Sequence, residues 1–70
     1  MKREPVESSN LAAIGYDSQS KTLEIEFNHG GVYQYFDVLP AAHKKLMDAP
    51  SLGQHFFYSV RGAYKCAFVS

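Results

Sequence analysis

Strict alternation of apolar and polar side chains at residues 22–27 constrains the fold more than any other feature of this sequence. The six residues read Thr-Leu-Glu-Ile-Glu-Phe, so the polar and the apolar side chains fall on opposite faces of an extended strand. A repeat of two residues fits a β-strand with one buried face and does not fit a helix. We therefore expect a sheet with one apolar face, against which the other elements pack.

An apolar run at residues 10–17 predicts a partner strand that precedes the first one. The run is short for a helix and is bounded by turn residues, and Gly15 inside it indicates a bulge or a close approach of another backbone. A four-residue turn at 18–21 fixes the register between the two strands. The predicted pairs are Tyr16 with Leu23, Ile14 with Ile25 and Ala12 with Phe27.

A third strand at residues 32–36 follows a short turn, and the length of that turn decides where two tyrosines point. A three-residue loop at 28–30 with a left-handed glycine places Tyr33 and Tyr35 on the apolar face. A two- or four-residue loop exposes both tyrosines instead. We favour the first arrangement because it keeps polar residues together on the other face. Its pairs are Ile25 with Tyr33, Glu24 with Gln34 and Leu23 with Tyr35.

Beyond residue 37 the apolar spacing changes to that of a helix. Pro40 suits a first helical turn, Pro50 ends that helix, and Ser51 is typical of the residue that caps the next one. The expected apolar positions of the first helix are Leu39, Ala42, Leu46 and Ala49. The second helix is expected over residues 52–60, with Leu52, Phe56 and Val60 as its apolar stripe and Gly53 marking a close neighbour.

These elements predict an α+β domain. A small antiparallel β-meander of three strands, joined by a C-terminal strand at residues 64–69, is covered by a two-helix hairpin. Residues 1–5 read as a flexible N-terminal arm, and residues 6–70 form a single domain. A chain of 70 residues allows one domain with a thin core.

Composition narrows the class of protein. Hydrophobic residues make up 46% of the chain and charged residues 20%, which is too apolar for a disordered protein. We find no run of about 18 apolar residues and no apolar segment behind the basic start, so we expect neither a membrane span nor a signal peptide. The one cysteine, Cys66, cannot close an internal disulfide, which favours a reducing, cytoplasmic setting.

The charges balance overall but are unevenly distributed. Seven basic and seven acidic residues give no net charge and a pI near 6.8, unlike a typical polyanion binder. Acidic residues dominate up to residue 40, and basic residues dominate beyond it. The basic residues of the second part are Lys44, Lys45, Arg61 and Lys65. This asymmetry indicates either a basic binding face on the helices or ordinary solvated helix surfaces.

The sequence offers no constellation for catalysis or metal binding. His29, His43 and His55 fall in a turn and on two helices, without the spacing of a helical metal site. We expect Cys66 to be buried and inert, and the two glutamates of residues 22–27 to face solvent. We therefore expect no enzyme, no metal ion and no cofactor.

Several short motifs together resemble the KTSC domain. They are Val6-x-Ser8-Ser9-Asn10-Leu11, Ile14-Gly15-Tyr16-Asp17, the strand pair Leu23-x-Ile25-x-Phe27-x-x-Gly30-x-x-Tyr33-x-Tyr35-x-x-Val38, and Ala49-Pro50-Ser51-x-Gly53-x-x-Phe56 followed by Val60-Arg61 and Tyr64. The match covers roughly residues 6–69. Two positions depart from the family pattern: Leu39 replaces a common proline, and Phe57 replaces a common asparagine.

The resemblance implies a non-enzymatic domain of uncharacterised function. The family occurs at the C-terminus of some lysyl-tRNA synthetases and as small free-standing bacterial or phage proteins, so RNA or tRNA is the partner that this association suggests. In this chain the natural phosphate contacts are Lys44, Lys45, Arg61 and Lys65, with Tyr58 and His55 beside them for stacking. Tyr33 and Tyr35 add a stacking surface if they are exposed.

The alternative is a protein-interaction or self-associating module with no nucleic-acid role. The zero net charge, a surplus of aromatic residues and an open edge strand support this alternative. The surplus aromatic residues are Phe36, Phe57, Tyr58, Tyr64 and Phe68. Such a module predicts a protein partner or a homo-oligomer.

Overall fold

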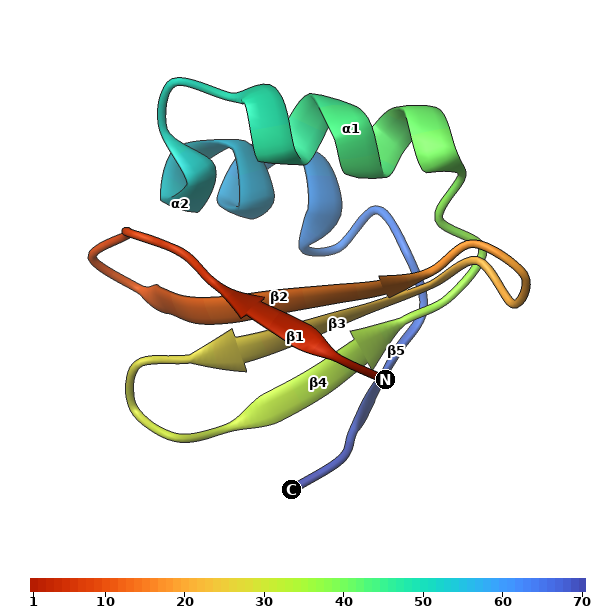
Figure 1. Ribbon diagram of the computed structural model, residues 1–70, viewed down its shortest axis with the longest axis horizontal. Coiled ribbons are helices and arrows are strands. Elements are labelled where there is room, and N and C mark those ends of the chain that lie inside the picture. Colours follow the sequence, from red (N-terminus) through yellow and green to blue (C-terminus); the bar gives the residue numbers. More distant parts are fainter.

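The computed structural model describes all 70 residues as a five-stranded antiparallel sheet with helices packed on one side (Figure 1). Neighbouring strands follow the order of the sequence. The elements are β1 (Arg3–Pro5), β2 (Leu11–Asp17), β3 (Thr22–Phe27), β4 (Val32–Tyr35), α1 (Pro40–Asp48), α2 (Leu52–His55), the wide helical turn η1 (Phe56–Val60) and β5 (Cys66–Phe68). The predicted α+β fold is confirmed, although the sheet has five strands and not four.

The register of the central hairpins follows the alternation of β3. Tyr16 faces Leu23 and Ile14 faces Ile25 across β2 and β3, as predicted. The three pairs predicted between β3 and β4 are also present, and Gly30 has the left-handed φ of 105° that the three-residue loop requires. Both tyrosines of β4 therefore lie on the helix side of the sheet.

The predicted pairing of Ala12 with Phe27 is wrong. The register shifts between Leu11 and Ala13, so that Leu11 faces Phe27. Such a bulge inserts one extra residue in a strand and changes which side chains point inward. Here it buries Leu11, which is 1% exposed, in place of the smaller Ala12.

One apolar core lies between the sheet and the helices. Its nine buried residues are Leu11, Ile14, Leu23, Ile25, Tyr35, Val38, Leu46, Phe56 and Val60. Leu46 of α1 is completely buried, which confirms the apolar face of that helix. Leu39 was predicted to share this face but is 55% exposed, because it precedes Pro40 as the N-cap residue and stands outside the helix.

The predicted helix over residues 52–60 has two parts. It begins at Ser51, whose hydroxyl accepts a hydrogen bond from the Gln54 backbone N–H at 3.4 Å. The helix then widens into η1, where the Arg61 N–H donates to the Phe56 carbonyl five residues earlier. The wider turn keeps Phe56 and Val60, each 4% exposed, on the side that faces the sheet.

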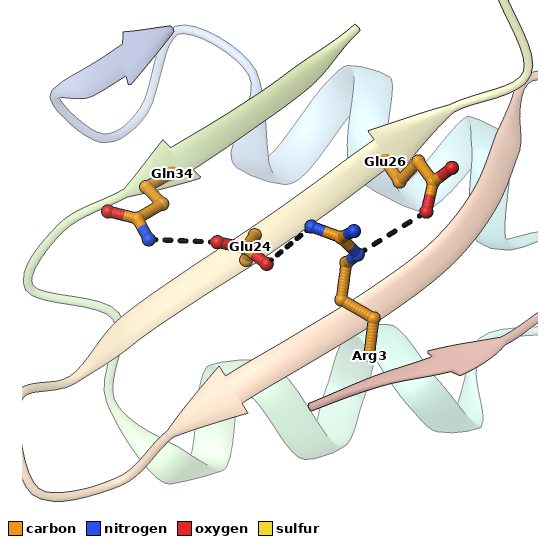
Figure 2. A network of polar contacts seen from close by, with 4 residues as sticks. All are labelled: Arg3, Glu24, Glu26 and Gln34. Atoms are coloured by element: carbon orange, nitrogen blue, oxygen red, sulfur yellow. Dashed lines mark hydrogen bonds and ion pairs between the residues drawn. The ribbon is translucent and has the colours of Figure 1, made fainter. Parts of the chain in front are cut away.

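The outer face of the sheet carries a polar network that ties β1 to the central strands (Figure 2). Glu24 was predicted to face solvent but is only 5% exposed, because Arg3 covers it. The Arg3 guanidinium lies 2.7 Å from one Glu24 oxygen and 3.3 Å from Glu26, and the Gln34 amide donates to the other Glu24 oxygen at 2.8 Å. The buried carboxylate thus has partners for both of its oxygens.

The same network explains why residues 1–5 do not form a free arm. Arg3 and Pro5 pair with β2 at Gly15 and Ala13, which extends the sheet by one edge strand. A Cβ atom at Gly15 would lie 2.9 Å from the Lys2 carbonyl oxygen. The close approach predicted at Gly15 is therefore the approach of the N-terminal segment.

Candidate functional site

A cleft of about 720 Å³ opens on the helix side of the sheet and is the clearest candidate site. Its walls come from the ends of β3 and β4, from α2 and η1, and from the start of β5. The lining residues are Ser9, Asn10, Phe27, Asn28, His29, Tyr33, Tyr35, Gly53, Phe56, Phe57, Arg61, Gly62 and Cys66. A volume of this size lies within the range of about 300–1,000 Å³ that is usual for small-ligand sites.

Four aromatic rings form the floor of the cleft. Phe27 meets Tyr33 and Phe56 edge to face, at centroid distances of 5.7 and 5.5 Å, and Phe56 meets Tyr35 in the same way at 5.5 Å. Edge-to-face contacts of this kind stabilise aromatic clusters beyond the area that they bury. Phe27 and Tyr33 stay half-buried, so parts of both rings remain accessible from the cleft.

The two tyrosines of β4 differ in their accessibility. Tyr35 is 5% exposed, and its burial raises the pKa of the phenol above its ordinary value. Tyr33 keeps intermediate exposure and also packs against Phe68 of β5, with the ring centroids 5.3 Å apart. Only Tyr33 can therefore offer a ring to a ligand, and Tyr35 is part of the core.

The loop between β3 and β4 contributes Asn28 and His29 to the cleft wall. The His29 imidazole stacks on the Phe27 ring, with centroids 5.3 Å apart and planes 3° from parallel. A Cβ atom at Gly31 would lie 3.1 Å from the His29 ring, so the small residue leaves room for this stack. The face of Phe27 thus already accommodates one flat, nitrogen-containing ring.

Arg61 is the only lining residue with a permanent charge. Its guanidinium carbon lies 5.0 Å from the centroid of the Phe57 ring, which is itself 53% exposed. A guanidinium held over an aromatic face is oriented by the ring and still has its N–H donors free. Phe57 stands where the resembled family commonly has an asparagine. Its ring contacts the Arg61 guanidinium, whereas an asparagine side chain at this position would offer hydrogen-bonding groups.

The third side of the cleft is polar. The Asn28 side chain donates to the carbonyls of Ser8 and Ser9 at 3.1 and 3.0 Å, which joins the β3–β4 loop to the entry of β2. The Ser8 hydroxyl accepts hydrogen bonds from the backbone N–H groups of Asn10 and Leu11, each at 3.3 Å, so this side chain holds the backbone at the entry of β2. The Asn10 side chain is exposed and forms none of the side-chain hydrogen bonds in this segment.

The sequence model of the KTSC domain matches residues 7–64 of this chain. The chain belongs to the KTSC domain family. It is similar to a KTSC domain protein of known crystal structure from Yersinia pestis, with a TM-score of 0.96, 39% identity, and coverage of 99% of this chain and 97% of that one.

Two kinds of protein are similar in sequence to this chain. An uncharacterised protein of Stutzerimonas stutzeri is 45% identical over 56 residues, which make up 80% of this chain and 79% of that protein. A lysine–tRNA ligase of Nostoc punctiforme is 42% identical over 59 residues, which cover 84% of this chain and 10% of the ligase. The chain therefore matches only a tenth of the length of the ligase.

The cleft of the KTSC domain brings together three of the predicted site residues. Tyr33, Tyr35 and Arg61 line it, whereas the other five predicted residues do not. Those five are Lys44 and Lys45 on α1, His55 at the end of α2, Tyr58 in η1 and Lys65 before β5. Lys44 is paired with Asp48 at 2.8 Å, a hydrogen bond that raises the pKa of the ammonium group.

Sequence reasoning missed most of the remaining lining residues. The prediction that Cys66 is buried is wrong, because β5 is an edge strand and leaves the free thiol exposed beside the cleft. Phe27 was identified as an inward-facing residue, but nothing in its spacing shows that the helices leave it partly uncovered. One signal was available in the sequence. Phe27 lies two residues beyond Ile25 on the same strand, and Ile25 was predicted to pair with Tyr33, so the rings of Phe27 and Tyr33 lie on the same face of the sheet.

Two further findings concern metal-binding groups and helices that could span a membrane. No group of three or more His, Cys, Asp or Glu side chains is arranged to hold a metal ion. No helix has both the length and the apolar character that crossing a membrane requires.

Proposed function

We propose that this KTSC domain is a small RNA-binding accessory module that receives RNA in the aromatic cleft. The observation that carries the proposal is the combination of accessible rings, Phe27 and Tyr33, with the single permanent charge of Arg61 in one cleft. RNA bases offer flat apolar faces, and each is joined to a negatively charged phosphate. A cleft with these two properties matches both parts of a nucleotide.

The energetic basis lies in stacking and in charge-assisted hydrogen bonds. Stacking of a base on an aromatic side chain contributes about 1–3 kcal/mol, and it suits any base. An Arg–phosphate contact adds about 1.5–3 kcal/mol. With no net charge on the chain, the affinity must come from this local chemistry and not from a broad basic surface.

The other predicted residues serve as secondary contacts in this proposal. Lys44, Lys45 and Lys65 supply phosphate contacts outside the cleft, and His55 and Tyr58 supply rings beside them. Tyr58 meets the Phe57 ring edge to face at 5.3 Å and is 79% exposed, so most of its ring stays available for stacking. Four cations are few for a nucleic-acid binder, so we expect modest affinity that falls with salt.

The family context supports the same ligand. A relative named lysine–tRNA ligase contains a region similar to this domain. An accessory domain joined to an enzyme that handles tRNA is well placed to contact RNA. A cytoplasmic location agrees with this proposal.

A titration with tRNA and with single-stranded RNA, at low and near-physiological salt, tests the proposal. Arg61→Glu is expected to weaken binding about tenfold or more, because it replaces a phosphate donor with a repelling charge. Lys21→Glu is the matched control, since it makes the same charge change in the turn at the other end of β3. Equal binding by wild type and Arg61→Glu would refute the role of the cleft.

A second variant tests whether the two lysines of α1, Lys44 and Lys45, contact the RNA. Lys44→Glu/Lys45→Glu is expected to lower the dependence of log affinity on log salt by about 1.4, if both residues contact phosphates of a single strand. An unchanged salt dependence would remove α1 from the interface and leave the cleft as the site.

A second candidate function is association with a protein or with another copy of the domain. The edge strand β5 has no charged residue or proline to block pairing, its Phe68 is 65% exposed, and Val69 directly after it is 47% exposed. The mass measured by light scattering across a range of protein concentrations tests self-association. A monomer at every concentration would count against this function.

A further inference from the structure

We infer that the cleft receives one unpaired nucleotide and reads the edge of its base through the side chain of Asn10. The inference rests on the proposed RNA-binding function and specifies the ligand. It follows from three features of the cleft that belong to different elements: a ring face, a cation and a free amide.

The ring face limits the ligand to a flat group. His29 already stacks on Phe27 with planes 3° from parallel, which shows that this face accepts a planar heterocycle. His29 itself is exposed and sits in a loop, so a base can stack in its place or beside it. The half-buried edge of Tyr33 closes the floor below.

The free amide supplies the means to distinguish bases. Asn10 offers both N–H donors and a carbonyl acceptor from one exposed side chain. Its backbone is held by the Ser8 hydroxyl and by the Asn28 N–H, which donates to the Asn10 carbonyl at 2.9 Å. The amide therefore stands on a fixed backbone with all of its hydrogen-bonding groups available, and an asparagine amide can form two hydrogen bonds with one base edge.

The second amide of the cleft has a different role. Both hydrogen bonds from the Asn28 Nδ2 atom go to backbone carbonyls of the Ser8–Asn10 segment, which fixes the position of Asn10 relative to the β3–β4 loop. Asn28 thus positions the reading residue, and only its oxygen remains for a ligand.

Arg61 adds the preference for a nucleotide over an uncharged ring. It is the one charged lining residue, and its guanidinium is oriented by Phe57 and has no acidic partner among the ion pairs of the protein. A phosphate next to the bound base complements this charge. A base in a duplex has both ring faces stacked and its pairing edge occupied, so only an unpaired nucleotide can use all three features.

Binding of four labelled homo-oligonucleotides (A, C, G and U) and of a perfectly paired RNA duplex to the purified protein tests the inference. We expect one base to bind about tenfold more tightly than the weakest, and the duplex to bind more weakly than that preferred single strand. Asn10→Ala is expected to remove this preference while keeping residual binding through the rings and Arg61. Gln54→Ala is the matched control, because it removes an exposed amide from α2 outside the cleft.

The outcomes separate the inference from the proposed function. Equal binding of all four oligonucleotides, binding of the duplex as tight as that of the best single strand, or a preference that survives in Asn10→Ala would overturn the inference and leave RNA binding standing. No binding of any RNA would overturn both. Asn10→Asp, which keeps the acceptors and loses the donors, is a second variant, and we expect it to alter the order of the four bases.

Discussion

Replacing Arg3 with methionine is expected to destabilise the domain by about 2 kcal/mol. Arg3 is the only cation paired with Glu24, whose side chain is 7% exposed, and the Arg3 Nη1 and Glu24 Oε2 atoms lie 2.7 Å apart. Removing one partner of a buried ion pair costs about 3–5 kcal/mol, because the other charge stays buried without compensation. The Arg3 side chain is 35% exposed, so solvent screens part of the interaction and lowers the expected loss.

Thermal and urea unfolding measure this loss directly. For a domain of this size, 2 kcal/mol corresponds to a fall of about 8–16 °C in Tm. Lys2→Met is the control, because Lys2 is the neighbouring exposed cation and takes part in none of the ion pairs. The double variant Arg3→Met/Glu24→Gln should be more stable than Arg3→Met alone, since glutamine removes the uncompensated charge.

Two results would refute this reasoning. One is an Arg3→Met variant whose free energy of unfolding stays within about 0.5 kcal/mol of wild type, as for an ordinary surface substitution. The other is a double variant that loses the sum of the two single losses, which would show that Arg3 and Glu24 act independently.

Three further predictions concern stability. His43 stacks on Tyr16 with the ring centroids 4.3 Å apart, and burial lowers the pKa of its imidazole below the ordinary value of 6.5. The unfolded chain therefore binds a proton more readily than the folded one, and the free energy of unfolding should fall as the pH drops below about 6.5. Urea unfolding from pH 8 to pH 5 should show this fall in wild type and a smaller one in His43→Phe. Gly15→Ala should cost about 1–3 kcal/mol because its Cβ would meet the Lys2 carbonyl at 2.9 Å, and a thermal melt as stable as that of wild type would contradict this. Ser51→Ala should cost about 0.5–2 kcal/mol in the same assay through loss of the helix cap.

Local pattern was enough to predict the central part of the fold. The alternation in β3 and the three-residue loop before β4 fixed the side on which Tyr33 and Tyr35 lie, because a one-residue change of register would reverse every side chain. Pro40, Pro50 and Ser51 marked the helix boundaries for reasons that are local to the backbone.

The features that escaped prediction depend on contacts between distant residues. β1 has three residues and no periodicity, and it is held by an ion pair between Arg3 and Glu24, which lie 21 positions apart. The bulge before Ala13 follows from the size of the side chain that fills the core. Phe27 at the end of β3 stays half-buried beside the cleft, and the spacing of residues within a helix does not determine how much of a sheet that helix covers.

Alkylation of Cys66 by iodoacetamide tests the central claim most directly, because this single, exposed thiol lines the cleft. The measurement compares the rate of alkylation of the folded protein alone with the rate in saturating single-stranded RNA, with binding monitored in the same sample. If RNA occupies the cleft, the rate should fall severalfold when RNA is bound and recover in Arg61→Glu at the same RNA concentration. Bound RNA that leaves the alkylation rate unchanged would contradict the account and place the RNA on another face.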